Sequence, residues 1–261
     1  MELFDSHCHL SDPGYQDHLE EIIKRAETNG VKYFLTIGLN LEDSKQAIQI
    51  TEHFPNVYCG IGIHPHDTDK ATEDDLKILE KLTYHQKVKA IGETGLDFYR
   101  NYSARNNQEK FFRLQIELAK KLNLPLVIHI RDAYSEAKAI LSEHQYFRGV
   151  IHCYSGDETF ARWAVNQGFY ISFAGVITYR NFRAQDLIKK VPKSRLLIET
   201  DAPYLTPEPM RGRINEPAFI KYTAVALAQI KETSYDDVCY FTKHNALILF
   251  NILSRACPTE T

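Results

Sequence analysis

Two histidines near the start of the sequence have the spacing of a chelating pair. His7 and His9 follow directly after an apolar run in the segment Phe4-Asp5-Ser6-His7-Cys8-His9. Residues two apart on an extended segment face the same way, so both imidazoles can bind one ion while Cys8 points elsewhere. Imidazole is a common ligand of divalent transition metals, and this pair therefore predicts a metal site.

Ionisable side chains of the same kinds follow four other short apolar runs. They are Glu93, His129, His152 and Asp201. A buried cluster of such groups is costly to desolvate without a counter-charge, and a divalent cation removes that cost. Nitrogen and oxygen donors without a thiolate set suit Zn, Mn, Fe or Co, and Mg where water fills the remaining positions. Four histidines and two carboxylates exceed one tetrahedral shell, which predicts two ions sharing a bridging carboxylate.

The segments that carry these residues alternate between predicted strands and predicted helices. The strand candidates are continuous apolar runs, which is typical of strands buried on both faces. They cover residues 2–7, 32–38, 57–63, 89–92, 126–129, 149–152, 169–173 and 195–200. Helical patterns cover residues 20–29, 43–53, 73–83, 108–122, 133–144, 158–167, 185–191, 217–231 and 235–251.

Strands that alternate with helices pair in parallel through crossovers, which indicates an α/β fold. Eight strand–helix units in about 250 residues predict a single (β/α)8 TIM barrel over residues 1–261, with an extra C-terminal helix. A doubly wound open sheet is the alternative, but no GxGxxG motif opens the first unit. In a TIM barrel the catalytic groups come from the carboxyl ends of the strands, where the histidines and carboxylates fall.

Composition limits the class of protein without identifying a partner. Hydrophobic residues make up 44% and charged residues 25%, which argues against disorder, collagen and coiled coil. The net charge of −3 gives no reason to expect nucleic acid. Five scattered cysteines without a CxxC motif favour reduced thiols and a cytoplasmic location. The N-terminus lacks a basic signal-peptide region, and the apolar runs are shorter than the roughly 20 residues that span a membrane.

Taken together, the motifs resemble those of the TatD-type DNases, a family of metal-dependent hydrolase barrels. The resemblance runs from about residue 2 to about residue 250 and rests on seven segments in order. They are His7-Cys8-His9-Leu10, Gly62-Ile63-His64-Pro65-His66, Gly92-Glu93-Thr94-Gly95-Leu96-Asp97, His129 with Arg131, His152-Cys153-Tyr154-Ser155-Gly156, Glu199-Thr200-Asp201-Ala202-Pro203-Tyr204-Leu205 and Asn215-Glu216-Pro217.

This resemblance implies a divalent-metal-dependent deoxyribonuclease, typically a 3′→5′ exonuclease that uses water activated by two metal ions. One ion would take His7, His9 and Asp201 with Glu93 bridging, and the other would take Glu93, His129 and His152. We therefore expect two divalent ions (Mg, Mn or Zn) as cofactors and the ends of DNA strands, single-stranded ones in particular, as the partner.

Three acidic or imidazole groups carry expected roles in the reaction. Asp201 is both a ligand and the candidate base for the attacking water. His64 is not needed as a ligand and either donates a proton to the phosphate or the leaving oxygen, or orients its strand. Glu199 lies two residues before Asp201 and either supports a metal-binding histidine or is a buried structural acid.

Residues on the loops after the strands are candidates for substrate binding. The arginines in this group can bind phosphate, form salt bridges or stay solvated, and the tyrosines can stack on a terminal base or simply pack. The candidates for substrate binding are Arg131, Arg100, Arg211 and Tyr154, with Arg213, Tyr99 and Tyr204 near the same rim. His66 is expected to be a loop residue.

Two other functions compete with the nuclease. The same metal pair would serve a barrel hydrolase that cleaves a cyclic amide, a lactone or an aminoacyl-tRNA ester. Loop arginines favour a polyanionic substrate over these. A non-catalytic metal-binding or scaffold protein would be expected to lack ligands, whereas the set is intact.

Overall fold

Eight parallel strands follow one another around a single sheet in the computed structural model, which describes residues 1–252. Each strand pairs with the next one along the chain. The strands are β1 (Leu3–Cys8), β2 (Val31–Gly38), β3 (Val57–Ile61), β4 (Val88–Asp97), β5 (Leu126–Arg131), β6 (Gly149–Ile151), β7 (Tyr170–Phe173) and β8 (Leu196–Ile198). The sheet curls into a nearly closed barrel, which confirms the predicted TIM barrel and makes the doubly wound alternative wrong.

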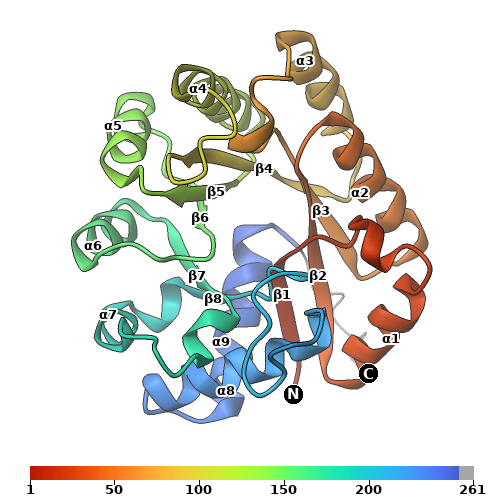
Figure 1. The fold of residues 1–261 in the computed structure, drawn as a ribbon, viewed down its shortest axis with the longest axis vertical. Coiled ribbons are helices and arrows are strands. Elements are labelled where there is room, and N and C mark those ends of the chain that lie inside the picture. Colours follow the sequence, from red (N-terminus) through yellow and green to blue (C-terminus); the bar gives the residue numbers. More distant parts are fainter. Residues whose placement is uncertain (253–261) are drawn as a thin grey trace, which may run out of the picture.

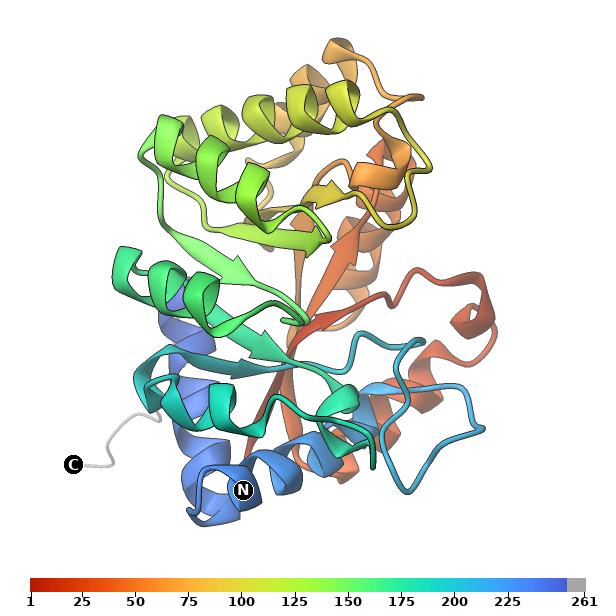
Figure 2. The same cartoon turned by 60° about the vertical axis from the view of Figure 1, so that its left-hand side comes forward.

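Helices lie between the strands and surround them, as Figures 1 and 2 show. They are α1 (Leu19–Thr28), α2 (Leu41–His53), α3 (Glu73–Leu82), α4 (Arg105–Leu122), α5 (Tyr134–His144), α6 (Glu158–Gln167), α7 (Gln185–Lys190), α8 (Ile220–Ile230) and α9 (Tyr235–Leu249). Side-chain caps fix several of their first turns. The clearest is the capping box at α3, in which Thr72 and Asp75 each accept the other's backbone N–H.

The interior of the barrel is apolar toward the end where the strands begin. Phe4, Val127 and Leu197 come from three strands and pack there with Leu249 of α9. Helix α9 contacts β1 and β8, and Figure 1 shows it behind the ring of strands. The predicted extra C-terminal helix therefore closes the amino end of the barrel. Polar side chains collect at the opposite end, where the strands finish.

One extra residue in β1 changes which of its side chains face the interior. Between Asp5 and Cys8, β1 advances three residues while β2 advances two. Before this bulge Phe4 packs inside the barrel, whereas beyond it Cys8 packs toward the helices and His7 joins the polar cluster inside. Bulges next to active sites commonly re-aim side chains in this way.

Strand β4 contains a bulge of the same kind. Between Ile91 and Thr94, β4 advances three residues while β5 advances two. Ala90 packs inside the barrel before the shift, and Glu93 and Asp97 face inside after it. The strand also continues to Asp97 instead of ending at residue 92 as predicted, because hydrogen bonding to β5 resumes after the bulge.

Side chains and loop backbone, in place of a regular ladder, join β1 to the segment after β8. The backbone N–H of Asp201 donates to His7 O at 2.9 Å. The buried carboxylate of Asp5 accepts the backbone N–H of Thr200 at 2.9 Å and its hydroxyl at 2.5 Å. These bonds hold the first and last strands together at their carboxyl ends. They therefore bring His7 beside Asp201, which is distant in the sequence.

The backbones of β4 and β5 approach closely at Gly95. Its φ is +131°, and a Cβ there would lie 2.0 Å from His129 O. We expect Gly95→Ala to lower the free energy of unfolding by about 3 kcal/mol or more, because both the backbone conformation and the clash oppose alanine. Chemical denaturation followed by circular dichroism measures this. Gly212 also has a positive φ of +88° but open space around it, so Gly212→Ala isolates the conformational part. Equal losses in both variants would contradict the steric explanation.

Cysteines and helices add two smaller observations. Cys8, Cys59, Cys153 and Cys239 are free thiols, and Cys257 lies outside the described residues. Within residues 1–252, none of the helices has the length and hydropathy needed to cross a bilayer. The single-domain prediction covers residues 1–261 and stays a prediction.

Candidate metal centre

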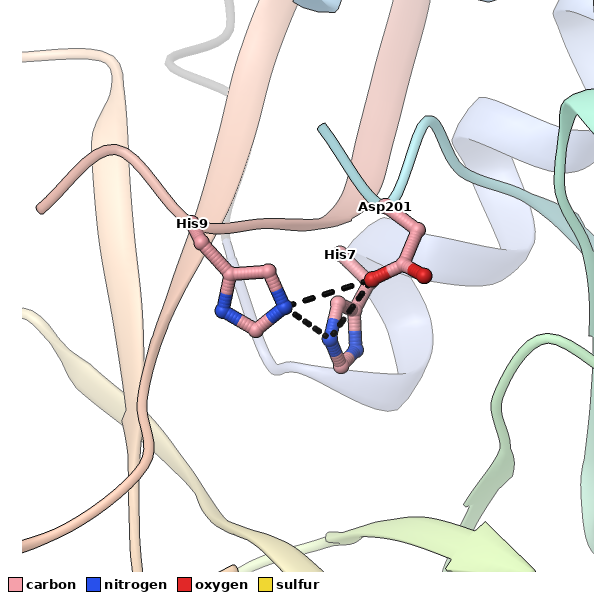
Figure 3. A group of neighbouring side chains, drawn as sticks. All are labelled: His7, His9 and Asp201. Carbon is pink, nitrogen blue, oxygen red and sulfur yellow. Dashed lines mark hydrogen bonds and ion pairs between the residues drawn. The ribbon is translucent and has the colours of Figure 1, made fainter. Parts of the chain in front are cut away.

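Two histidines of β1 and its following loop meet an aspartate that follows β8. Figure 3 shows the imidazoles of His7 and His9 turned toward the carboxylate of Asp201. The Nε2 atoms of the two histidines are 3.3 Å apart. Asp201 Oδ1 lies 3.2 Å from His9 Nε2 and 3.7 Å from His7 Nε2. The three donor atoms therefore converge on one point.

Glu93 connects this group to a second one. Its Oε2 lies 3.3 Å from His7 Nε2, and its Oε1 lies 2.8 Å from His152 Nε2 and 3.0 Å from His129 Nδ1. The side chain is buried. One carboxylate thus turns one oxygen toward each of two sets of ring nitrogens. Such an arrangement suits a carboxylate shared by two cations.

The residues present fit divalent cations. The ring nitrogens of His129 and His152 that face Glu93 are 3.1 Å apart. Two donors on one tetrahedral ion with bonds of about 2.1 Å lie about 3.4 Å apart, close to the spacings seen here. Buried carboxylates and imidazoles turned toward one point also lack a counter-charge of their own, which a cation supplies.

In two imidazoles, the ring nitrogen that faces away from Glu93 is hydrogen-bonded to a carboxylate. This contact sets which ring nitrogen carries the proton. His152 Nδ1 lies 3.2 Å from Glu199 Oε1, and His129 Nε2 lies 3.2 Å from Asp97 Oδ2. A carboxylate holds the ring proton on the nitrogen that faces it. With the ring proton on the other nitrogen, His152 Nε2 and His129 Nδ1 would be available as ligands when a cation binds beside Glu93. Glu199 thus lies where a supporting carboxylate is expected.

His64 differs from His129 and His152 in turning its protonated ring nitrogen toward Glu93. Its Nδ1 accepts the backbone N–H of His66 at 3.1 Å, so a neutral ring carries its proton on Nε2. That Nε2–H points at Glu93 Oε1, 3.3 Å away. Burial lowers the pKa of His64 to about 4, which keeps the ring neutral. The hydrogen bonding therefore favours a donor over a ligand.

The carboxylates of the cluster stay ionised. Burial by itself raises the pKa of Glu93, but electrostatic interactions with the neighbouring imidazoles of His152, His64 and His7 hold this pKa well below its ordinary value. The pKa of Asp201 is lowered for the same kind of reason: burial opposes ionisation, and the contact with His9 outweighs it.

Asp97 is the buried acid that the sequence reasoning did not assign to the site. Its Oδ2 accepts from His129 Nε2 at 3.2 Å and from His66 Nε2 at 2.8 Å. Its Oδ1 accepts the backbone N–H groups of Tyr99 and Arg100. His66 is therefore attached to the site and is more than a loop residue. Counting in steps of two from Glu93 along the strand would have found Asp97, because such residues share a face.

The predicted substrate-binding arginines lie on exposed parts of the rim. Arg131 ends β5, and its guanidinium carbon lies 4.1 Å from the centre of the Tyr99 ring. Arg100 lies over the same ring at 5.5 Å. Arg211 instead donates to the hydroxyl of Tyr179 at 2.7 Å.

Two of the three tyrosines named for base stacking have opposite environments. Tyr154 is 3% exposed, and its ring packs in the core against Tyr134 and Phe160 while its hydroxyl donates to Asp157 O. The expectation that Tyr154 binds substrate is therefore wrong, because its ring has no open face. Tyr204 is 53% exposed with its ring edge-on to His9 at 5.8 Å.

Comparisons with known proteins agree with this architecture. The family model described as TatD related DNase matches residues 4–251. The uncharacterized metal-dependent hydrolase YabD of Bacillus subtilis (strain 168) is 40% identical over 253 residues, 96% of this chain and 99% of the relative. The 3'-5' ssDNA/RNA exonuclease TatD of Escherichia fergusonii is 33% identical and covers 96% and 99% of the two chains.

A solved structure has the same fold. The TatD homolog YJJV of Escherichia coli K12 superimposes with a TM-score of 0.91 at 28% identity, over 96% of this chain and 98% of that one. The match of the family model to nearly the whole chain and the identity to curated relatives agree with the convergent histidines and carboxylates. The chain belongs to the TatD-related DNase family of metal-dependent hydrolases.

Proposed function

We propose that this protein is a divalent-metal-dependent deoxyribonuclease that removes nucleotides from the 3′ ends of single-stranded DNA. The observation that carries the proposal is Glu93, which turns one oxygen toward His7 and the other toward His129 and His152. Paired divalent ions of this kind are typical of phosphodiester hydrolysis. The relative from Escherichia fergusonii that is named an exonuclease supports the same direction of cleavage.

The residues that would hold the ions fall into two sets around Glu93. His7, His9 and Asp201 form one set, and His129 and His152 form the other. Bound divalent ions lower the pKa of water and neutralise charge on the phosphate. Mg, Mn and Zn all suit these donors.

Two side chains would manage protons during the reaction. Asp201 is held in its ionised form at the open end of the barrel, where it can accept a proton from the attacking water. His64 presents its Nε2–H beside Glu93 and can donate this hydrogen bond to a phosphate oxygen or the leaving oxygen.

The exposed ring of Tyr204 next to His9 offers a surface for a terminal base, and Arg211 adds positive charge to the same rim.

Digestion of one single-stranded oligonucleotide, labelled at either end, tests the proposal. With Mg or Mn, we expect the 3′ label to be released at once as a mononucleotide and the 5′ label to form a ladder of shortening products. An RNA strand of the same sequence tests the preference for DNA. The reaction with EDTA is the control for metal dependence.

Three outcomes would contradict parts of this proposal. Early release of the 5′ label would reverse the direction of cleavage. Equal digestion in EDTA would remove the role of the metals. Absence of DNA cleavage together with hydrolysis of a lactone, a cyclic amide or an aminoacyl ester would favour the alternative barrel hydrolase.

A further inference from the structure

Two arginines beside the metal centre share one aromatic ring. Arg131 and Arg100 place their guanidinium carbons 4.1 Å and 5.5 Å from the centre of the Tyr99 ring. Tyr99 and Arg100 belong to the loop between β4 and α4, and Arg131 is the last residue of β5. All three side chains are exposed. The ring therefore gathers two positive charges at one place on the rim.

Neither charge is neutralised within the described part of the chain. No ion pair or side-chain hydrogen bond joins Arg100 or Arg131 to another described residue. Two arginines elsewhere in the described residues are neutralised by ion pairs, Arg25 with Glu216 and Arg113 with Glu143. Guanidinium groups match phosphate oxygens in geometry and charge, so an unpaired couple of them is suited to an anion.

The same loop is tied directly to the metal centre. Asp97 Oδ1 accepts the backbone N–H groups of Tyr99 at 3.0 Å and Arg100 at 2.8 Å. The other oxygen of this carboxylate accepts from His129 Nε2. Arg131 pairs with Asp97 across the two strands and lies two residues beyond His129, or about 6.6 Å along the strand. Asp97 therefore fixes the positions of both arginines relative to His129, which is a proposed metal ligand.

We propose that Arg100 and Arg131, gathered by Tyr99, form a second phosphate-binding subsite beside the metal centre. This inference rests on the proposed nuclease function and names the part of the substrate that the subsite takes. One phosphodiester of the strand lies at the metal centre, and the neighbouring phosphodiester binds the two arginines. Strands with at least two internal phosphates then bind more tightly than a dinucleotide with one.

Binding of short phosphorothioate strands, which resist cleavage, tests the subsite in the full-length protein with metal supplied. Dithymidine with one linkage and trithymidine with two linkages compete with a fluorescent oligonucleotide, and fluorescence anisotropy reports their Kd values. In the wild type we expect the second linkage to strengthen binding about tenfold. In the double variant Arg100→Gln/Arg131→Gln this gain is lost. For a longer single strand, the slope of log Kd against log salt falls by about 0.7 for each arginine removed.

Two further variants separate charge from position. Tyr99→Phe keeps the ring and retains the gain, whereas Tyr99→Ala loses it because the guanidinium groups lose their support. The matched control is Arg195→Gln, which removes an arginine that lies over Tyr170 just before β8, at the opposite end of the barrel. This control removes one positive charge, as each of the single variants Arg100→Gln and Arg131→Gln does, and leaves the gain intact.

Each outcome decides the inference independently of catalysis. A wild type without the tenfold gain, or a double variant that keeps it, overturns the subsite. Equal loss in the Arg195 variant also overturns it, because general charge then explains the binding. Failure of the wild type to digest DNA would reject the nuclease function, while the binding ratios would still decide the phosphate subsite.

Discussion

Glu93→Gln is expected to reduce DNA hydrolysis by about a thousandfold or more. Glutamine keeps the shape of the side chain but removes the negative charge that His7, His129 and His152 now share. A neutral amide is a poor bridge between cations, because its NH2 group has no lone pair to offer the cation that it would face. Initial rates on 3′-labelled single-stranded DNA measure the loss. Metal content by mass spectrometry should fall from about two ions per chain to fewer.

A matched control for this variant is Glu117→Gln. Glu117 also contacts an imidazole, with Oε1 2.5 Å from His144 Nδ1, but it lies on α4 outside the cluster. Its substitution should leave both rate and metal content unchanged. Equal activity of wild type and Glu93→Gln would reject Glu93 as the shared ligand. Loss of activity with unchanged metal content would instead assign Glu93 a role other than metal binding.

Asp97→Asn is expected to weaken metal binding by 10- to 100-fold and to lower the hydrolysis rate similarly. The carboxylate accepts four hydrogen bonds, two from ring nitrogens of His129 and His66 and two from the backbone of the following loop. Asparagine supplies one oxygen and an NH2 group. The NH2 group would face ring or backbone N–H groups that now donate to a carboxylate oxygen, and these hydrogen bonds would be lost. His129 then loses the partner that keeps its Nδ1 free for metal.

Titration calorimetry with Mn on the metal-free protein measures this effect apart from catalysis. Asp69→Asn is the control, because Asp69 accepts the backbone N–H of Ala104 before α4 but contacts no histidine of the site. Unchanged affinity in Asp97→Asn would show that His129 needs no orienting carboxylate. Equal weakening in both variants would point to general damage around α4.

The order of strands and helices could be read from the sequence because each element carries its own local signal. Continuous apolar runs predicted the strands, and the predicted helices agree with the observed ones apart from a few residues at their ends. The shared location of the polar residues that come after those runs could also be predicted, since the carboxyl ends of parallel strands meet at one rim. Tyr154 could not be assigned this way, because its position in a loop did not reveal that the loop turns the ring into the core.

The sequence by itself determined which residues reach the rim, and only the tertiary structure decided which way they face. In β1 and β4 a simple alternation from Phe4 and Ala90 would turn His7 and Glu93 toward the helices. One extra residue in each strand reverses that direction. A bulge is defined by the pairing with a neighbouring strand that lies far along the chain, so no local pattern records it. The hydrogen bonds between Asp5 and Thr200 likewise join residues that are far apart in the sequence. They complete the cluster by bringing Asp201 to His7 and His9.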